Sequence, residues 1–261
     1  MESLARFGYV SKGFVYGLIG ILALLAAFNQ GGKTTDATGA LHEIAAQPFG
    51  QIVLILIAIG LVGYVIWRLI EAFKDPDHHG SDAKGLAIRV GYLISGLVYS
   101  GIAFNAALLA IGSSSGGGSG NSQQDWTAMV MQQPFGRWLV GLAGAIIVGL
   151  GFALIYQAYK EKFRRKLNMS ELNGQQKDWL VKISRFGIAA RGVVFIIIGF
   201  FVLQAAYKSD PNQVRGLDGA LLSLSQQPFG KFLLALVAAG LVAYGIYLFV
   251  QARYRRLKFS G

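Results

Sequence analysis

The sequence predicts an all-α integral membrane protein whose six transmembrane helices form three parallel helical-hairpin repeats about a pseudo-threefold axis. Three observations predict this fold class: the composition, six long apolar segments, and a motif that recurs three times. Hydrophobic residues make up 54% of the 261 residues and charged residues only 14%, whereas a soluble domain carries about 25% charge. A soluble fold of this size could not hide so much apolar surface from water. The composition therefore argues against a soluble enzyme and a disordered protein, and the absence of cysteine excludes a disulfide scaffold.

Six apolar segments reach the length of about 20 residues that a bilayer-spanning helix needs. In chain order they are, roughly, Phe7–Phe28, Gly50–Phe73, Val90–Ile111, Trp138–Tyr159, Phe186–Tyr207 and Phe232–Ala252. Such continuous apolarity predicts helices embedded in lipid rather than amphipathic helices on a soluble core. We interpret the first segment as a retained helix rather than a signal peptide, because it exceeds the usual apolar core of about 7–15 residues.

The cations are distributed unevenly between the two ends of these helices. Most of the 24 lysines and arginines fall in the connections at 74–89 and 160–185 and in the C-terminal tail. By the positive-inside rule these segments and both termini face the cytoplasm, and 30–46, 112–134 and 208–226 lie outside. The net charge of +11 is therefore a topology signal, with attraction to anionic lipid at the cytoplasmic face as a consequence. The expected partner is the lipid bilayer, and no nucleic acid is expected.

An internal repeat divides the chain into three. The tetrapeptide Gln-Pro-Phe-Gly occurs at 47–50, 133–136 and 227–230. An Arg-x-Gly motif opens the first helix of each hairpin, at Arg6/Gly8, Arg89/Gly91 and Arg185/Gly187. We interpret 1–261 as a single membrane domain with repeats 1–74, 84–160 and 180–256, joined by inner linkers 75–83 and 161–179. Because each repeat holds an even number of helices, all three enter the membrane in the same orientation, which favours a pseudo-threefold axis along the membrane normal.

Two features of the repeat have structural interpretations. A glycine follows each leading arginine by seven residues, at Gly13, Gly96 and Gly192. We expect these glycines to let neighbouring helices approach closely, equally in the three repeats. The proline of each tetrapeptide is expected in the first turn of the second helix, where its missing N–H costs little; these are Pro48, Pro134 and Pro228. The short amphipathic segment before each proline, Ala40–Gln47 in the first repeat, is expected in the outer interface.

These registered motifs resemble a bacterial membrane family known as domain of unknown function 1206. The resemblance rests on the threefold Arg-x-Gly helix, the acid that follows it (Asp36, Asp125 and Asp218) and the tetrapeptide, and it covers nearly the whole chain. It implies three two-helix repeats and a bacterial inner (plasma) membrane location. It implies no activity and assigns no functional residue. The second repeat departs most from the pattern, because Asp125-Trp-Thr-Ala-Met replaces the Asp-x-x-Gly-Ala-Leu of the first.

No catalytic motif is recognisable in the sequence. Patterns for a nucleophilic serine, a zinc protease or a phosphate-binding loop do not occur. Of the three histidines, His42 is expected in the outer interface, and His78 and His79 lie in an inner loop with nearby aspartates. Adjacent histidines cannot easily form a tight site, and no second cluster completes four ligands. We therefore expect no enzyme activity, no cofactor and no metal site.

Ionisable residues inside the apolar segments are the candidate site, because such residues usually face a cavity or a partner. Six residues after the leading arginines stand Lys12, Ser95 and Arg191, and near the inner ends of the second helices stand Glu71, Gln157 and Gln251. Arg68 precedes Glu71 by three residues on the same helix face. One interpretation is that the cations extend to the inner interface and fix helix depth. The other is a polar inner vestibule that binds an anionic solute or a lipid headgroup.

The favoured function is therefore the binding or passage of a small solute, ion or lipid. The alternative is a non-catalytic structural or accessory protein that packs against a larger membrane complex through glycine-rich and aromatic helix faces.

Overall fold

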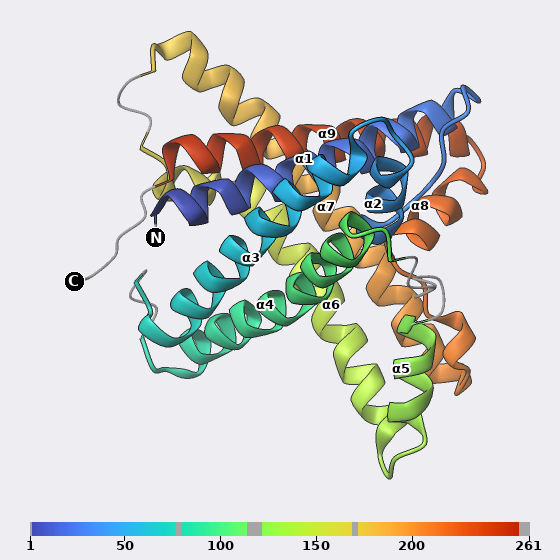
Figure 1. Cartoon of the computed structure of the whole chain (residues 1–261). Helices are drawn as coiled ribbons and strands as arrows, with labels where there is room; N and C mark the ends of the chain where they lie inside the picture. Colours follow the sequence, from blue (N-terminus) through green and yellow to red (C-terminus); the bar gives the residue numbers. More distant parts are fainter. Residues whose placement is uncertain (1, 77–79, 114–121, 169–171, 256–261) are drawn as a thin grey trace.

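The computed structural model of the chain describes residues 2–76, 80–113, 122–168 and 172–255 (Figure 1). Six of its helices are long and apolar enough to cross a membrane. They are α1 (Glu2–Ala27), α3 (Gly50–Lys74), α4 (Ala83–Ala110), α6 (Gly136–Tyr159), α7 (Gly174–Lys208) and α9 (Gly230–Tyr254). The six predicted spans are thus confirmed as helices, and their length and apolarity indicate a multi-pass membrane protein. Several helices begin earlier than predicted: α1 at Glu2 rather than Phe7, α4 at Ala83 rather than Val90, and α7 at Gly174 rather than Phe186. At the start of α7 the Gln176 side chain accepts a hydrogen bond from the backbone N–H of Asn173 (3.3 Å).

Short helices connect the long ones. They are α2 (Ala37–Ala45), α5 (Ser122–Met131), the 3₁₀ segments η1 (Lys162–Lys166) and η2 (Pro211–Gln213), and α8 (Leu217–Ser225). The helices α2, α5 and α8 precede the three tetrapeptides, where short amphipathic segments were expected. Asp36 caps the N-terminus of α2. Its carboxylate accepts a hydrogen bond from the backbone N–H of Gly39 (2.8 Å) and so satisfies one unpaired donor of the first turn.

The prediction for the tetrapeptide proline was wrong. Pro48 lies in a turn before α3, since the N–H of Gly50 donates to the carbonyl of Gln47 (2.9 Å) and Phe49 has φ of 63°. A left-handed residue at this point interrupts the helix, so the helix begins after the proline rather than around it.

The other two repeats make the same turn. Pro134 and Pro228 also lie before their helices, and the left-handed phenylalanines Phe135 and Phe229 precede α6 and α9. The glycine that ends the motif is required by space, because a Cβ on Gly50 would overlap a backbone carbonyl oxygen at the end of α2.

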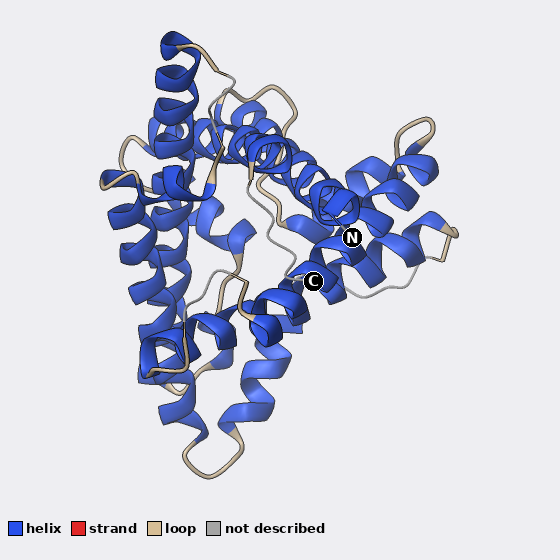
Figure 2. Cartoon of the chain, turned by 90° about the vertical axis from the view of Figure 1, so that its left-hand side faces the viewer, coloured by secondary structure: helices blue, strands red, loops and turns tan. Residues whose placement is uncertain are grey.

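Helix pairing links neighbouring repeats. The second helix of each repeat packs against the first helix of the next, in the pairs α3/α4, α6/α7 and α9/α1. In Figure 1 the pair α1/α9 runs across the upper half, α3/α4 extends to the lower left and α6 extends to the bottom. Within repeats, α1 packs on α3 and α7 packs on α9, but the described parts of α4 and α6 do not pack along each other. Figure 2 shows the helices from the side on which the inner ends of α1 and α9 lie.

Side-chain size explains why the described parts of α4 and α6, the two long helices of the second repeat, do not pack along each other; we call this repeat open. A Cβ on Gly60 of α3 would overlap the Ser11 hydroxyl of α1. A Cβ on Gly240 of α9 would overlap the methyl group of Ala190 on α7. The equivalent positions of the second repeat are Ile146 and Ile94, which are 54% and 57% exposed. Small residues allow backbones to approach, and two isoleucines at these positions prevent it.

The glycines that follow the leading arginines lie at the contacts between repeats. A Cβ on Gly13 would lie 2.9 Å from the carbonyl oxygen of Gly245 on α9, and a Cβ on Gly192 would lie 2.8 Å from that of Gly151 on α6. Gly96 differs, because a Cβ there would lie 3.7 Å from its nearest neighbour, a side-chain atom of α3. Close approach is therefore present in two of the three pairs, and the expectation of equal tightness was wrong.

Two of the leading arginines stabilise the ends of neighbouring helices. Arg6 donates to the carbonyl oxygens of Ala252 and Arg253 at the end of α9 (2.6 Å each). Arg89 donates in the same way to two carbonyl oxygens at the end of α3, those of residue 72 (2.6 Å) and residue 73 (3.2 Å). The last carbonyls of a helix lack intrahelical partners and carry partial negative charge, so a guanidinium there satisfies both needs.

In the third repeat the leading arginine has an acidic partner instead. Arg185 donates to the carboxylate of Glu161, just beyond α6 (3.1 Å), and Arg164 donates to the same carboxylate (2.7 Å). The hydrogen bond from Arg164 is the main cause that lowers the pKa of Glu161.

Candidate functional site

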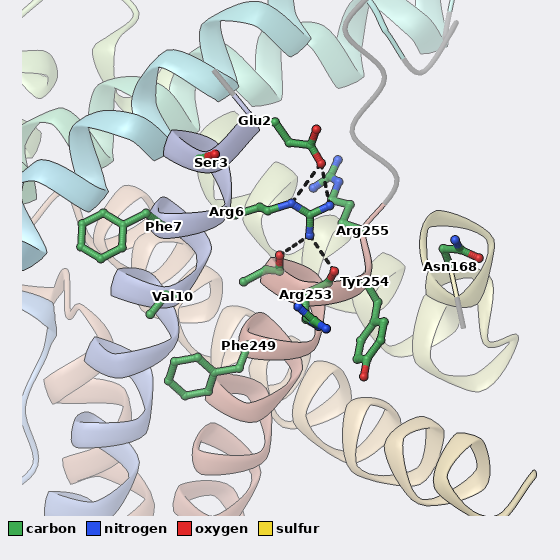
Figure 3. A pocket seen from close by; sticks show the side chains of 11 residues that line it. Glu2, Ser3, Arg6, Phe7, Val10, Asn168, Phe249, Arg253, Tyr254 and Arg255 are labelled. Atoms are coloured by element: carbon green, nitrogen blue, oxygen red, sulfur yellow. Dashed lines mark hydrogen bonds and ion pairs between the residues drawn. The ribbon is translucent and has the colours of Figure 1, made fainter. Parts of the chain in front are cut away.

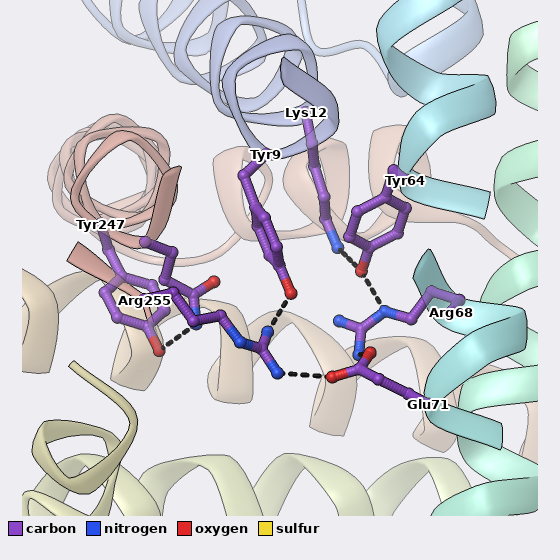
Figure 4. Close-up of polar contacts among 8 residues, drawn as sticks. Tyr9, Lys12, Tyr64, Arg68, Glu71, Tyr247 and Arg255 are labelled. Carbon is purple, nitrogen blue, oxygen red and sulfur yellow. Dashed lines mark hydrogen bonds and ion pairs between the residues drawn. The ribbon is translucent and has the colours of Figure 1, made fainter. Parts of the chain in front are cut away.

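Six side chains form a connected group that we call the inner polar cluster (Figure 4). Its members are Tyr9 and Lys12 from α1, Tyr64, Arg68 and Glu71 from α3, and Arg255 at the end of α9. The three α3 residues are spaced four and three positions apart, so they share one helix face. The cluster lies toward the ends of the helices that are predicted to face the cytoplasm, which we call the inner ends.

Glu71 joins two guanidinium groups. It accepts from Arg68 on its own helix (2.7 Å) and from Arg255 at the end of α9 (2.5 Å). Glu71 is 1% exposed and Arg255 is 4% exposed. Arg255 also donates to the Tyr9 hydroxyl. A buried charge survives only when it is paired and hydrogen-bonded, and Glu71 meets both conditions.

Lys12 points into the bundle rather than toward lipid headgroups. Its side chain is 2% exposed, and its Nζ donates to the Tyr64 hydroxyl (2.8 Å), which also accepts from Arg68 (2.7 Å). The ammonium lies 4.4 Å from the ring centroid of Tyr64 and 4.3 Å from that of Tyr99. Two aromatic faces at this distance stabilise a desolvated cation.

Arg191 forms a second group beside the cluster. Its guanidinium donates to the Tyr244 hydroxyl and lies 4.9 Å from the ring of Phe195 and 5.8 Å from that of Tyr16. Tyr16 is hydrogen-bonded to Tyr99 (3.3 Å), whose ring also contacts the lysine of the cluster. The Nε of Arg191 is buried and has no acceptor among the described residues. Tyr16 and Tyr99 therefore lie between Arg191 and Lys12, which make no direct bond with each other.

The remaining predicted residues are less involved. Gln251 donates to the Tyr247 hydroxyl (2.9 Å) and is 8% exposed. Ser95 and Gln157 are half-buried and make no side-chain hydrogen bond to a described residue. The structure thus brings the three charged residues of the first repeat into one group and places the second repeat's polar residues outside it.

Cations outnumber acids in this region. Four basic side chains lie here, Lys12, Arg68, Arg191 and Arg255. Within the described residues Glu71 pairs with Arg68 and Arg255, whereas Lys12 and Arg191 donate to tyrosine hydroxyls. Over the same part of the chain, no group of three or more metal-ligating side chains occurs. The two histidines at 78 and 79 lie outside the described residues. The expectation that they form no metal site therefore stays a prediction.

The sequence model of a family described as Domain of Unknown Function (DUF1206) matches residues 7–75, 90–161 and 186–255. The chain belongs to this family. It is also 37% identical to "Uncharacterized protein YxxB" of Bacillus subtilis (strain 168) over 257 residues, which cover 98% of this chain and 92% of the relative. No solved structure matches the chain.

Several site residues of this DUF1206 member are missing from the site that the sequence predicts. Tyr64 and Tyr244 both stand fourteen positions after the tetrapeptide glycine, where the second repeat has Leu150, so registering the repeats offered a signal. Arg255 carried no such signal, because in the sequence it is one of several basic residues in the C-terminal tail. Only the fold shows that it turns inward to Glu71.

Proposed function

We propose that this protein spans the bacterial inner membrane with both termini in the cytoplasm, its helix pairs related by a pseudo-threefold axis. We further propose that it binds a small anion at the inner polar cluster and Arg191. The role is binding or passage rather than catalysis. The cation distribution and the contacts of α9 with α1, which bring the last repeat back to the first, support the membrane arrangement.

The observation that carries the anion proposal is the surplus of buried basic side chains over buried acids. Lys12 is 2% exposed, yet among the described residues Glu71 pairs with Arg68 and Arg255, and Lys12 and Arg191 have tyrosine hydroxyls rather than a carboxylate as acceptors. Leaving a cation in hydrocarbon costs roughly 2.5–3.5 kcal/mol on insertion scales. Tyrosine rings offset part of that cost for Lys12 and Arg191. An anion held by the remaining donors, including the unpaired Arg191 Nε, would offset more.

The chemistry of the donors favours an oxyanion. Guanidinium and phenol groups present several N–H and O–H donors, which match the oxygens of phosphate, sulfate or a carboxylate better than a single spherical ion. The rings of Tyr16, Tyr64, Tyr99 and Tyr244 lie between the helices at this level, with centroid distances of 4.8 Å for Tyr64–Tyr99 and 5.0 Å for Tyr16–Tyr244. Because these rings pack against one another between the helices, they support a binding site rather than a wide channel.

The experiment uses inorganic phosphate as the probe. The unfolding temperature of the purified protein in neutral detergent is measured with phosphate and with chloride at equal ionic strength. We expect phosphate to stabilise the wild type, and we expect Lys12→Met combined with Arg191→Met to weaken phosphate binding about tenfold or more, or about 1.4 kcal/mol. Phosphate uptake into liposomes, measured in parallel, separates passage from binding.

The matched control removes two cations from the outer end. Arg137 and Lys231 are exposed and stand at the beginnings of α6 and α9, so Arg137→Met with Lys231→Met should leave the phosphate response unchanged. Arg191→Lys keeps the charge and guards against a variant that fails to fold. A phosphate response that the inner and outer double variants share would contradict the proposal.

A second candidate is an accessory role, and the open second repeat favours it. Ile94 and Ile146 are more than half exposed on the faces where the other repeats pack, and a Cβ on Gly91 or Gly149 would meet no atom within 4 Å. A helix of a partner protein would cover this surface. The test is a cysteine at Ile146, which should crosslink to a partner in native membranes, while a cysteine at the exposed Leu236 of α9 should not.

A further inference from the structure

A surface cavity of about 920 Å³ opens between the inner ends of α1 and α9 (Figure 3). Three cations line it, Arg6, Arg253 and Arg255, against one acid, Glu2. Its other lining side chains include three apolar ones that lie farther along the helices toward the middle of the membrane, at Phe7, Val10 and Phe249. The cavity is therefore basic at its mouth and apolar behind it.

One of the cations is available for a ligand. Arg6 is bonded to Glu2 and to two backbone carbonyls, and Arg255 is bonded to Glu71 and Tyr9. The Arg253 side chain is exposed and makes no hydrogen bond or ion pair with a described residue. Arg6 keeps a partly exposed guanidinium at the same mouth. The position of the mouth at the cationic end of the helices suits a group with negative charge.

An apolar groove lies next to the cavity. A groove of about 340 Å³ between α1 and α9 is lined by Phe14, Gly17 and Ile246, among others, and Phe249 lines both the groove and the cavity. A Cβ on Gly17 would meet no atom within 4 Å, so glycine leaves space there. From Arg6 to Gly17 the helix rises about 16 Å, a length that a fatty acyl chain can follow.

We infer that this crevice binds one anionic glycerophospholipid. Its headgroup phosphate lies against Arg253 and Arg6, and one acyl chain lies in the groove beside Gly17. Charge complementarity at the mouth selects an anionic over a zwitterionic lipid, and burial of the chain in an apolar groove favours a lipid over a free anion as the occupant. Arg255 lines the cavity and also belongs to the inner polar cluster, but neither Arg253 nor Gly17 does, so variants at these two residues test the lipid site separately from the proposed anion site.

The test measures lipid retained by the purified full-length protein. The protein is reconstituted with equal amounts of phosphatidylglycerol and phosphatidylcholine, re-extracted in mild detergent, and its bound lipids are counted by native mass spectrometry. We expect phosphatidylglycerol to be retained preferentially, and Arg253→Gln to reduce that preference about fivefold. Gly17→Phe fills the groove and should reduce retention of both lipids.

Two variants control for general effects. Lys231→Gln removes an exposed cation from the opposite end of α9, and Gly101→Phe adds the same ring where a Cβ also meets nothing within 4 Å. Both should retain lipid like the wild type. Wild-type retention by both Arg253→Gln and Gly17→Phe overturns the inference. An effect of only one of them also overturns it, because the bound lipid must use the mouth and the groove together.

Discussion

At the scale of single residues, Glu71 connects the most distant charged groups of the inner polar cluster. Its carboxylate holds Arg68 on its own helix and Arg255, which lies 184 positions later in the chain. Breaking a buried ion pair leaves the remaining charges uncompensated, which costs more than the pair contributes. The acid therefore matters to the fold as well as to any ligand.

Glu71→Gln should lower the free energy of unfolding by about 3–5 kcal/mol, because Arg68 and Arg255 would lose their shared counter-charge. The measurement is reversible unfolding in mixed micelles. Adding Arg255→Gln to Glu71→Gln should cost less than the two single losses together, since the variants remove one interaction.

The control for this cycle is Lys231→Gln. Lys231 is exposed and lies at the beginning of α9, away from the cluster, so its loss should change stability little. Strictly additive losses from Glu71→Gln and Arg255→Gln would show that these two side chains do not interact.

At the scale of helices, small residues decide which helices pack within a repeat. A Cβ on Gly8 would lie 2.6 Å from the backbone nitrogen of Tyr64, and a Cβ on Gly187 would overlap the backbone nitrogen of Tyr244. A Cβ on the equivalent Gly91 would meet no atom within 4 Å. The same Arg-x-Gly motif therefore serves a close contact in two repeats and an open face in the third.

Leucine at these positions should destabilise two repeats and spare the third. Gly8→Leu and Gly187→Leu must push α1 from α3 and α7 from α9, and overpacking of this kind costs about 1–3 kcal/mol or more. Gly91→Leu should leave the unfolding temperature close to that of the wild type. The three variants are compared by thermal unfolding in one detergent. A loss with Gly91→Leu equal to the other two would mean that α4 and α6 pack together in the membrane.

At the scale of the whole molecule, the helix order predicts which segments each side of the membrane can reach. Because the chain has no cysteine, single cysteines can be introduced and labelled with a membrane-impermeant reagent in intact cells. Cysteines within 30–46, 112–113 and 208–226 should be labelled from outside. Cysteines within 74–76 and 160–168 should react only after the cells are opened, as the positive-inside rule requires. Labelling of both inner connections in intact cells would reverse the proposed orientation.

The six helices and the three repeats could be predicted from the sequence because each depends on local information. An apolar run of membrane length forms a helix whatever its neighbours are, since backbone groups in lipid must bond within the segment. The inner charged residues Lys12, Glu71 and Arg191 could be identified for the same reason, because a charge inside such a run is costly wherever it lies. The turn at Pro48 could not be foreseen, because it depends on the left-handed backbone of Phe49.

The contacts between helices were decided only in the folded molecule. Registered repeats predicted three equivalent hairpins, but packing depends on the pair of side chains that meet. Isoleucines in the second repeat keep α4 from α6, where Ser11 with Gly60 allows α1 to reach α3. The partners of the buried charges were equally hidden. Arg255 reaches Glu71 because α9 returns beside α1, and a contact between such distant positions follows from the arrangement of whole helices rather than from any local pattern.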